Sequence, residues 1–473
     1  MGFKLIPLWT DVLVYVLLAT IAAFAYQARH KEHLRAPWRH VARRKLAMSA
    51  MVVLLVYVAI GILDSIHFKL PLQQQQNNLS GEVHYGPELS VFDLLCGPLR
   101  TQTEKTYSEP FATRLFAKEN IETPSGQIRD YPRLRFGGAH LNSEQDKAQD
   151  IVLGVLFAFI LALLSVLIIS AALSAWLVWR QQSLKQNFNQ QFLCVLQGKT
   201  EIPWQSMLLT LGGLLLVFFT IVVFAGKYHI LGTDKVGQDV LYLTLKSIRT
   251  GLLIGTLTTL IMLPFAIMMG IMAGYFRGWV DDVVQYIYTT LNAIPGVLLI
   301  AAAILSLQVY MANNPELFDS VSSRADMRLV FLCAILGVTS WTGLCRLLRG
   351  ETLKLSQVDY IEAAHAFGVG HFKLMTRHIL PNVMHIVLIA VVLDFSGLVL
   401  AEAVLSYVGV GVDPSMISWG NMINSARLEL AREPVVWWSL IAAFIFMFVL
   451  VLAANLFSDA VRDAFDPRVN RAT

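Results

Sequence analysis

The chain has 473 residues, of which 56% are hydrophobic and 15% are charged, and its formal net charge is +4. Soluble domains carry about 25% charged residues, so this composition excludes an ordinary soluble protein. The Lys and Arg residues lie beside long apolar segments, as the positive-inside rule describes, which argues against a nucleic-acid-binding face. The four cysteines are scattered and form no CxxC pair, so neither a disulfide framework nor a metal cluster is expected.

Apolar blocks of about 20 residues, the length that crosses a bilayer, recur along the chain. We predict an all-α polytopic membrane protein with about nine transmembrane helices. Pro264 and Pro295 fall inside two of these helices, where a proline kinks the helix and frees carbonyl groups. The predicted segments are 8–26, 46–63, 150–179, 207–225, 249–275, 284–311, 328–346, 384–405 and 436–457.

Basic residues between the first two segments set the expected orientation. Residues 29–45 contain seven Lys and Arg residues against one acid, Glu32. Such a cluster stays in the cytoplasm, so we expect a periplasmic N-terminus and, after nine crossings, a cytoplasmic C-terminus. The apolar run after Lys4 also resembles a signal peptide, but the bases that follow it favour a retained helix.

This orientation places residues 64–148 in the periplasm. The stretch is polar, rich in Pro and Gly, and carries four consecutive Gln residues at 73–76. We expect a small irregular or β-rich insertion, because long structureless loops are uncommon in compact proteins. A passive loop is the alternative, and docking of a binding protein is the hypothesis for its role. Residues 180–206 are expected to form a cytoplasmic connector.

Motifs for nucleotide binding or hydrolysis are missing from the sequence. It contains no GxxxxGK[ST], no HExxH and no GxSxG. His371 and His378 are expected to be surface residues and not metal ligands. Any energy for transport must therefore come from another protein.

The polar segment 346–382 separates two apolar segments and carries several helix signals. Ser356 is predicted to cap a helix, with Asp359 as its acidic partner. Gly368 permits the left-handed turn that ends this helix. Along the helix, Ile361, Ala364 and Phe367 are expected to form a narrow apolar face.

A second helix is predicted over about 371–380, ending at Pro381. A short amphipathic helix of this kind can lie in a groove of a partner protein. A linker helix resting on the bilayer is the alternative that the residues leave open.

The same segment resembles a known motif. Glu362-Ala363-Ala364, Gly368 and Ile379-Leu380-Pro381 are similar to the EAA---G---------I-LP motif of ABC-importer permeases. The resemblance implies that this loop couples the permease to ATPase subunits. The implied coupling residues are Asp359, Glu362, Ala363, Ala364, Gly368, Ile379, Leu380 and Pro381.

Other blocks resemble the C-type subunit of dipeptide, oligopeptide and nickel importers. They are residues 231–239, 274–281, 402–411, 418–422 and 461–468. Gln238 stands where the family usually has Arg, and Arg277 where it usually has Gly. The first block supplies a periplasmic family motif at Gly232, Thr233, Asp234, Gly237 and Asp239.

The resemblance implies a six-helix type I importer core with additions. The expected parts are an extra N-terminal helix and basic loop (1–45), the first core helix (46–63), the insertion (64–148), an extra transmembrane hairpin (149–225), the permease core (226–457, with the coupling loop 346–382) and a cytoplasmic tail (458–473).

A mechanism and a set of partners follow from the resemblance. Two ATPase subunits would bind ATP and Mg²⁺, while this chain binds no cofactor and catalyses no reaction. A B-type second permease and a periplasmic solute-binding protein would complete the importer in the bacterial inner membrane. Closure of the ATPases would move the coupling helix and switch the pathway between its two faces, a form of alternating access.

Two acids in the eighth predicted helix are candidate pathway residues. Asp394 lies near its middle, where a carboxylate costs several kcal/mol unless it is paired or hydrated. It is expected to face the pathway, where a positive group of a peptide could bind, or to pair with a base of the partner subunit. Glu402 matches a family position and is expected to be structural.

Two other functions remain as alternatives at this point, an ion-coupled secondary transporter and a membrane scaffold. The sequence also leaves the solute open among di- and oligopeptides, peptide-like antibiotics and metal chelates.

Overall fold

The computed structural model describes residues 4–5, 8–29, 32–71, 85–123, 126–180, 188–317 and 321–465. The Gln run at 73–76 and the tail after residue 465 lie outside the described residues. Within them, eight helices are long and apolar enough to cross a membrane, and Trp9–Thr20 is a shorter apolar helix. The prediction of an all-α polytopic membrane protein is confirmed.

The chain forms two compact units. Unit 1 comprises Met1–Ile6, Ala36–Arg249 and Ile417–Ala460, and unit 2 comprises Pro7–Arg35, Thr250–Met416 and Val461–Thr473. Helices α2 (Glu32–Arg43), α9 (Val240–Phe276) and α18 (Trp438–Phe465) pass from one unit to the other along the chain.

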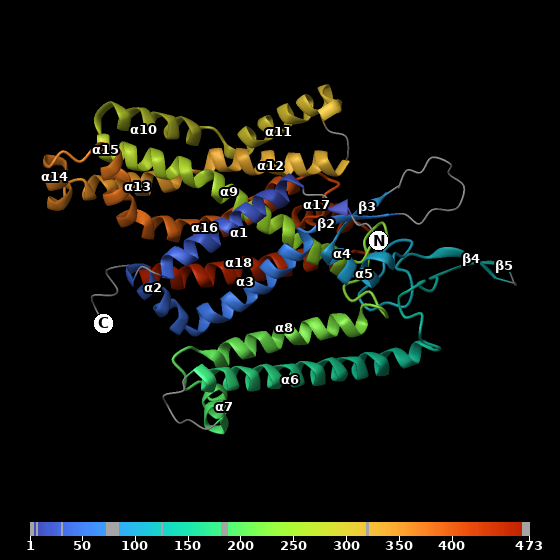
Figure 1. The fold of residues 1–473 in the computed structure, drawn as a ribbon. Helices are drawn as coiled ribbons and strands as arrows, with labels where there is room; N and C mark the ends of the chain where they lie inside the picture. Colours follow the sequence, from blue (N-terminus) through green and yellow to red (C-terminus); the bar gives the residue numbers. More distant parts are fainter. Residues whose placement is uncertain are drawn as a thin grey trace. The chain divides into compact units, whose positions relative to one another are not determined.

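Helices make up most of unit 1. They include α3 (Lys45–Asp64), α6 (Lys147–Arg180), α7 (Phe188–Leu196), α8 (Trp204–Phe224) and α17 (Trp419–Glu429). Helices α6 and α8 run side by side (Figure 1). The buried face of α6 consists of small residues, which let helices approach closely in a membrane. At Gly154, an added Cβ would collide with the Phe224 ring of α8.

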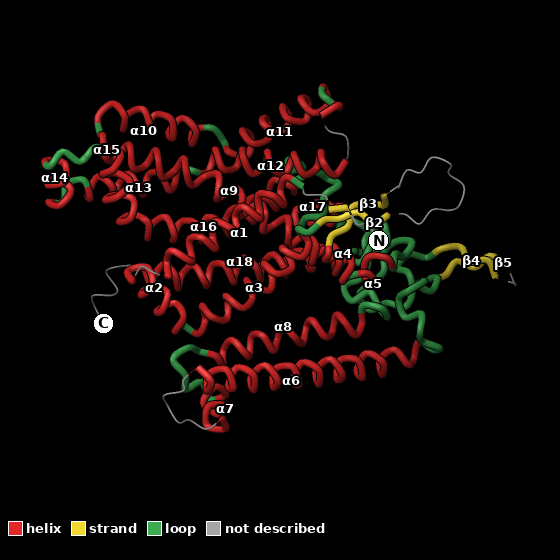
Figure 2. The backbone as a smooth tube through the Cα atoms, in the orientation of Figure 1, coloured by secondary structure: helices red, strands yellow, loops and turns green. Residues whose placement is uncertain are grey.

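The insertion between α3 and α6 is largely irregular, with two small sheets. Strands β1 (Lys4–Leu5), β2 (His67–Pro71) and β3 (Tyr85–Ser90) form one antiparallel sheet, and β4 (Glu119–Thr123) and β5 (Gly126–Asp130) form a hairpin. Figure 2 shows how short these strands are beside the helices and loops. Short helices α4 (Val91–Leu95) and α5 (Gly97–Thr101) follow β3, and a 3₁₀ turn, Glu144–Asp146, precedes α6.

Unit 2 consists of helices. These are α1 (Trp9–Arg29), α10 (Gly278–Ala293), α11 (Gly296–Asn313), a 3₁₀ turn (Pro315–Leu317), α12 (Val321–Ser340), α13 (Thr342–Leu355), α14 (Asp359–Ala366), α15 (His371–Leu374), a π-helical turn (Met375–Ile379) and α16 (Leu380–Tyr407). Helix α1 packs on α12, where Thr10 N donates to Asp326 Oδ2 at 3.2 Å.

The single helix predicted over 284–311 is wrong. Helix α10 ends at Ala293 and α11 begins at Gly296, so Pro295 separates two helices and does not kink one. Because a proline disfavours helical backbone in the residue before it, Ile294 is extended, with φ −86° and ψ 129°. Pro264, in contrast, lies inside the continuous helix α9, as predicted.

Candidate functional site

Helix α14 carries the Glu-Ala-Ala motif. It begins after Val358, and its first turn contains Asp359 and Glu362, whose negative charges are favourable at a helix N-terminus. Ile361 is 2% exposed, and Ala364 packs against the same hydrophobic cluster. Glu362 and Ala363 are exposed. The motif therefore anchors α14 with one face and presents the acid and the first alanine with the other.

Gly368 ends this helix as predicted. Its φ is +79°, a left-handed value that favours glycine. Gly368 N donates to His365 O at 2.9 Å and Val369 N to Ala364 O at 3.1 Å, the two bonds of a Schellman turn. An added Cβ would have no neighbour within 4 Å among the described residues. Backbone conformation, and not packing within this chain, therefore requires glycine here.

Two predicted details of α14 are wrong. Ser356 does not cap it, because α13 continues to Leu355 and Ser356 donates back to Leu353 O at 2.9 Å. Phe367 does not share a face with Ile361, since it is 88% exposed. Six residues at 3.6 per turn rotate the chain by roughly one and two-thirds turns, which places Phe367 about 120° from Ile361.

The predicted stop at Pro381 is also wrong. Helix α15 continues through the π-helical turn into α16, and Pro381 is near the start of α16. The extra residue of a π turn shifts the hydrogen-bond register, and a proline is tolerated in the first turn of a helix. Asn382 holds this region, donating to His378 O at 2.6 Å and to Tyr360 Oη at 3.0 Å.

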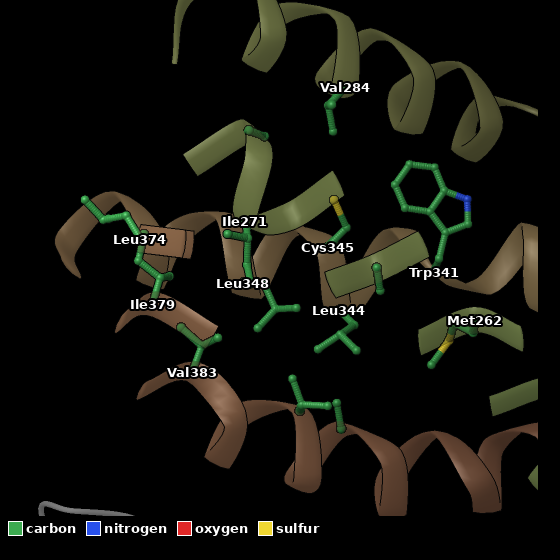
Figure 3. Packing of buried hydrophobic residues seen from close by; sticks show 14 of the residues in the cluster. Met262, Ile271, Val284, Trp341, Leu344, Cys345, Leu348, Leu374, Ile379 and Val383 are labelled. Atoms are coloured by element: carbon green, nitrogen blue, oxygen red, sulfur yellow. The ribbon is translucent and has the colours of Figure 1, made fainter. Parts of the chain in front are cut away.

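A hydrophobic cluster underlies the segment 356–382. Leu374, Ile379 and Val383 are each fully buried. They belong to the same cluster as Ile271 of α9 and Leu348 of α13 (Figure 3). Leu380 is partly buried against the same cluster. The motif positions Ile379 and Leu380 therefore fix the segment to the cluster that it shares with α9 and α13.

Helices α9 and α13 meet at Gly270 and Gly274, a contact that is not among those predicted from the sequence. A Cβ on Gly270 would lie 2.8 Å from Leu348 Cβ and 2.9 Å from Cys345 O. One on Gly274 would lie 2.6 Å from Thr352 Cβ. The GxxxG spacing of the two glycines is the sequence signal that could have identified this contact.

An ion pair reinforces the same region. Arg349 of α13 donates to Asp281 of α10 from two guanidinium nitrogens, Nε to Oδ1 at 2.5 Å and Nη2 to Oδ2 at 2.6 Å. The hydrogen bond from Arg349 lowers the pKa of Asp281. Bidentate pairs of this kind are geometrically specific as well as strong.

Beside α14 lies a cavity of about 660 Å³. Tyr275 Oη and His371 Nδ1 are 2.8 Å apart on its wall, and the rings of His365 and His371 are 5.4 Å apart. His371 is thus exposed but hydrogen-bonded, which confirms the expectation of a surface residue. No group of three or more His, Cys, Asp or Glu side chains in the described residues could hold a metal.

The second motif, residues 231–239, lies in unit 1 and packs against the insertion. Thr233 N donates to Ser108 O at 3.1 Å, and Trp438 Nε1 donates to Thr233 O at 2.9 Å. Gly232 and Gly237 have φ of +73° and +78°. A Cβ on Gly237 would collide with the backbone of Glu104, whose N donates to Gly237 O at 2.9 Å.

The carboxylates of this motif are both used in hydrogen bonds. Asp234 Oδ1 accepts from Val236 N at 2.9 Å and from Gln238 N at 2.8 Å, which closes the loop on itself. Asp239 Oδ1 accepts from Leu241 N at 2.9 Å at the start of α9. The side chain at 238 thus has no part in closing the loop, so Gln can stand in place of Arg.

Asp239 also joins a buried charged group with His229 and Glu104. His229 Nδ1 is 2.8 Å from Asp239 Oδ2, and Nε2 is 3.5 Å from Glu104 Oε1, within ion-pair range but outside hydrogen-bond geometry. Burial lowers the pKa of His229, but its interactions with Asp239 and Glu104 outweigh burial and raise the pKa to about 9. The imidazolium therefore links the insertion to the motif at neutral pH.

Glu104 is held on its other side by backbone. It accepts from Arg135 N at 2.9 Å and Phe136 N at 2.8 Å. Burial raises its pKa, while the ion pair with His229 and the hydrogen bonds from these N–H groups lower it to about 2. This buried cluster joins residues more than a hundred positions apart, which no local sequence signal could have shown.

Asp394 and Glu402 occupy different environments on α16. Glu402 is 2% exposed, and its Oε1 accepts from Ser406 Oγ at 2.7 Å. Asp394 is half-buried. Within the described chain, its carboxylate makes no ion pair or side-chain hydrogen bond. The two acids therefore differ in burial and in hydrogen bonding, and the buried, hydrogen-bonded Glu402 fits the structural role predicted for it.

Comparison with known proteins identifies the family. A family model described as "Binding-protein-dependent transport system inner membrane component" matches residues 266–471. The glutathione transport system permease protein GsiD of Pectobacterium atrosepticum is 32% identical over 241 residues, which are 51% of this chain and 73% of the relative. The oligopeptide transport system permease protein OppC of Mycobacterium tuberculosis is 32% identical over 242 residues, 51% of this chain and 77% of the relative.

A third relative is the dipeptide transport system permease protein DppC of Bacillus subtilis, 28% identical over 243 residues, 51% of this chain and 70% of the relative. The similarity thus covers half of this chain but most of each relative. The chain belongs to the binding-protein-dependent inner-membrane transport components, as a C-type permease subunit of an ABC importer.

Proposed function

We propose that this permease imports peptides or peptide-like solutes and that α14 with Gly368 is the segment that its ATPases move. The observation that carries this proposal is the arrangement of the Glu-Ala-Ala motif. One face of α14 is anchored by Ile361 in the cluster beneath it, while Glu362 and Ala363 are exposed. A partner protein can contact the exposed face of such a segment, and a displacement of the segment is then transmitted to the cluster through its buried face.

Transmission is supported by the packing beneath the segment. Buried Leu374, Ile379 and Val383 share one cluster with Leu348 of α13, and close-packed interiors transmit displacement because they resist compression. Rigid-body movement of α9, α13 and α16 would then switch the pathway between its two faces. Neither a secondary transporter nor a scaffold is favoured by the family to which the chain belongs.

We also propose the solute, the orientation in the membrane, the partners and the role of Asp394. The relatives are named for glutathione, oligopeptide and dipeptide transport, which supports a peptide-like solute here. We place residues 346–382 in the cytoplasm with the C-terminus, and residues 64–148 in the periplasm with the N-terminus. The partners are a B-type permease, two ATPases that bind ATP and Mg²⁺, and a periplasmic binding protein. Asp394 faces the pathway in this proposal.

Cross-linking in native membranes tests the coupling role. In a variant with Ala363→Cys, we expect a bond to an ATPase subunit that forms only when both are present. Trp279→Cys is the matched control, because Trp279 is 76% exposed at the start of α10 and lies outside the Glu-Ala-Ala motif. Cross-linking of neither position, or of both equally, contradicts the assignment.

A functional measurement separates coupling from assembly. Replacing Gly368 by Val opposes the +79° φ, at a cost of about 1–3 kcal/mol. We expect the complex to assemble and hydrolyse ATP but to lose most of its ATP-driven uptake. Uptake at the normal rate with intact assembly would refute the role of this turn.

We also propose that the insertion receives the binding protein. The β4–β5 hairpin supports this, since it is largely exposed and carries charged side chains such as Glu122 and Arg129. Deleting residues 119–130 should weaken capture of the binding protein by the reconstituted importer. Unchanged capture would remove the hairpin from the proposed interface.

A further inference from the structure

An apolar cavity of about 600 Å³ lies within unit 1, and no part of the proposed transport mechanism uses it. Its walls come from the membrane-spanning helices α3, α8 and α18, the start of α9, and the short helices α4 and α5. Tyr57, Val217 and Phe446 are among its lining residues. It therefore joins the added helix α8 and the insertion to three long helices of the same unit.

The lining excludes a polar occupant. Its polar side-chain atoms belong to Tyr57 and Cys96, and Tyr57 Oη already donates to Phe446 O at 3.0 Å. Burial raises the pKa of the Cys96 thiol to about 12, as expected in apolar surroundings. A bound water needs two to four polar partners, which these walls do not supply.

The volume also discriminates between apolar occupants. An α-helix is about 10–12 Å across, so a cavity of this size holds only about one turn of it. A slender hydrocarbon chain can enter from the bilayer beside Val217 and Phe218, which are each 54% exposed. An acyl chain therefore fits this cavity better than a helix of a partner protein.

A second, polar cavity of about 270 Å³ adjoins the first, because Leu99 lines both. Its acids already have partners. Glu88 pairs with Lys69 at 3.1 Å, Asp93 with Lys246 at 2.5 Å, and Asp239 with His229.

Arg100, also on the wall of the polar cavity, differs from these groups. Its guanidinium makes no ion pair or side-chain hydrogen bond with any residue that the structure describes. Next to it, Leu94 and Leu95 of α4 are 55% and 66% exposed. Exposed leucines and a base without an ion-pair partner among the described residues are typical of a segment at a membrane interface, where lipid phosphates lie.

We propose that a membrane phospholipid occupies the two cavities, with an acyl chain in the apolar one and its phosphate at Arg100. The lipid would fill the space between α8 and the other helices of unit 1 and so hold the added segments in place. This proposal concerns unit 1 alone and does not depend on the solute or on the coupling role of α14.

Photolabelling of the assembled importer in membranes tests the proposal. The probe is phosphatidylglycerol with a diazirine in the middle of one acyl chain, and labelled peptides are mapped by mass spectrometry. We expect labels within residues 91–101 and 208–225. Val217→Trp, which fills the cavity, should reduce labelling at least five-fold. Leu209→Trp, on the same helix but 71% exposed and outside the cavity, should leave it within two-fold.

The headgroup contact has its own matched pair. Arg100→Gln should lower labelling by the phospholipid several-fold but leave labelling by a diazirine fatty alcohol, which lacks phosphate, unchanged. Arg129→Gln, which removes an exposed charge from β5, should change neither. Equal labelling of the wild type and Val217→Trp overturns the proposal. Equal labelling of the wild type and Arg100→Gln by the phospholipid also overturns it.

A measurement on the unaltered chain guards against misfolded variants. In delipidated detergent solution, an apolar diazirine hydrocarbon should label residues 91–101 of the unaltered chain, and added phosphatidylglycerol should reduce this labelling several-fold. Protection of these residues by partner subunits without lipid would show that protein fills the cavity and would overturn the proposal.

Discussion

Arg277 occupies a backbone conformation that residues other than glycine rarely adopt. Its φ is +55° and its ψ −166°, and such a conformation costs on the order of 1–3 kcal/mol for a side chain with a Cβ. In return, Arg277 Nη2 donates to Ser356 Oγ at 2.9 Å at an exposed site. The family usually has glycine at this position. In this chain the arginine strains the backbone but provides a hydrogen bond that links the end of α9 to the end of α13.

This exchange gives a prediction with opposite signs for two variants. Arg277→Gly relieves the strain and loses one exposed hydrogen bond, so we expect a net gain of about 1 kcal/mol. Arg277→Ala loses the bond and keeps the strain, so it should lower stability. Thermal unfolding of the purified permease measures both, and a common sign for the two variants would contradict the strain argument.

The buried His229 predicts a dependence of stability on pH. Its pKa is about 9 in the folded protein and about 6.5 when unfolded. Because the folded value is the higher one, the stabilisation is complete below pH 6.5 and is lost as pH rises through 9. The shift corresponds to roughly 3 kcal/mol.

The difference in melting temperature between the wild type and His229→Gln isolates this effect. We expect a large difference at pH 6.5 that shrinks by pH 10. Glu104 behaves in the opposite sense, since its folded pKa of about 2 is below the ordinary 4.5. Its contribution is present above pH 4.5 and is lost as pH falls toward 2. A difference that stays constant from pH 6.5 to 10 would show that His229 is not charged in the folded state.

At the scale of elements, the contact between α9 and α13 depends on two glycines. A methyl group on Gly274 would lie 2.6 Å from Thr352 Cβ and 2.7 Å from Arg349 O, so the helices must move apart. We expect Gly274→Ala to cost about 1–3 kcal/mol and to reduce ATP-driven uptake, since these helices support α14. Gly397→Ala in α16 is the matched control, because its Cβ meets nothing within 4 Å. Equal melting temperatures for the two variants would refute the contact.

Local signals predicted α14 only in part. The turn at Gly368 was predictable because a residue with left-handed backbone conformation at the end of a helix is usually glycine, which is visible in the sequence. The start of the helix was not, because Ser356 resembles a cap in the sequence but follows directly on α13, and the residue before α14 is Val358, which has no capping side chain. The π turn likewise has no local signal, so Pro381 was wrongly read as the end of a helix when it is near the beginning of α16.

At the scale of the whole chain, the apolar segments were predictable from the sequence, but the attachment of the insertion was not. The apolar segments were predictable because hydrophobic length alone decides membrane crossing. The contacts of Thr233 with Ser108 and Trp438 join positions 125 and 205 residues apart. Such pairings depend on tertiary packing, so the insertion could be recognised from the sequence but its attachment to residues 231–239 could not.

This attachment predicts that two deletions in the insertion differ in outcome. Removing residues 119–130 and joining the ends with a short turn should leave folding intact, because Glu119 and Asp130 are paired neighbours and the hairpin is largely exposed. Removing residues 70–145 also removes Glu104 and Ser108, which leaves the buried His229 without one partner and Thr233 N without its acceptor. Each buried group left unpaired costs about 1–3 kcal/mol.

We therefore expect the hairpin deletion to melt within a few degrees of the wild type and the larger deletion to fail to accumulate in the membrane. Membrane yield and melting temperature of the two variants provide the measurement. Normal yield and stability of the larger deletion would show that residues 231–239 fold without the insertion, and the contacts of Glu104, Ser108 and His229 would then not be needed to hold this loop.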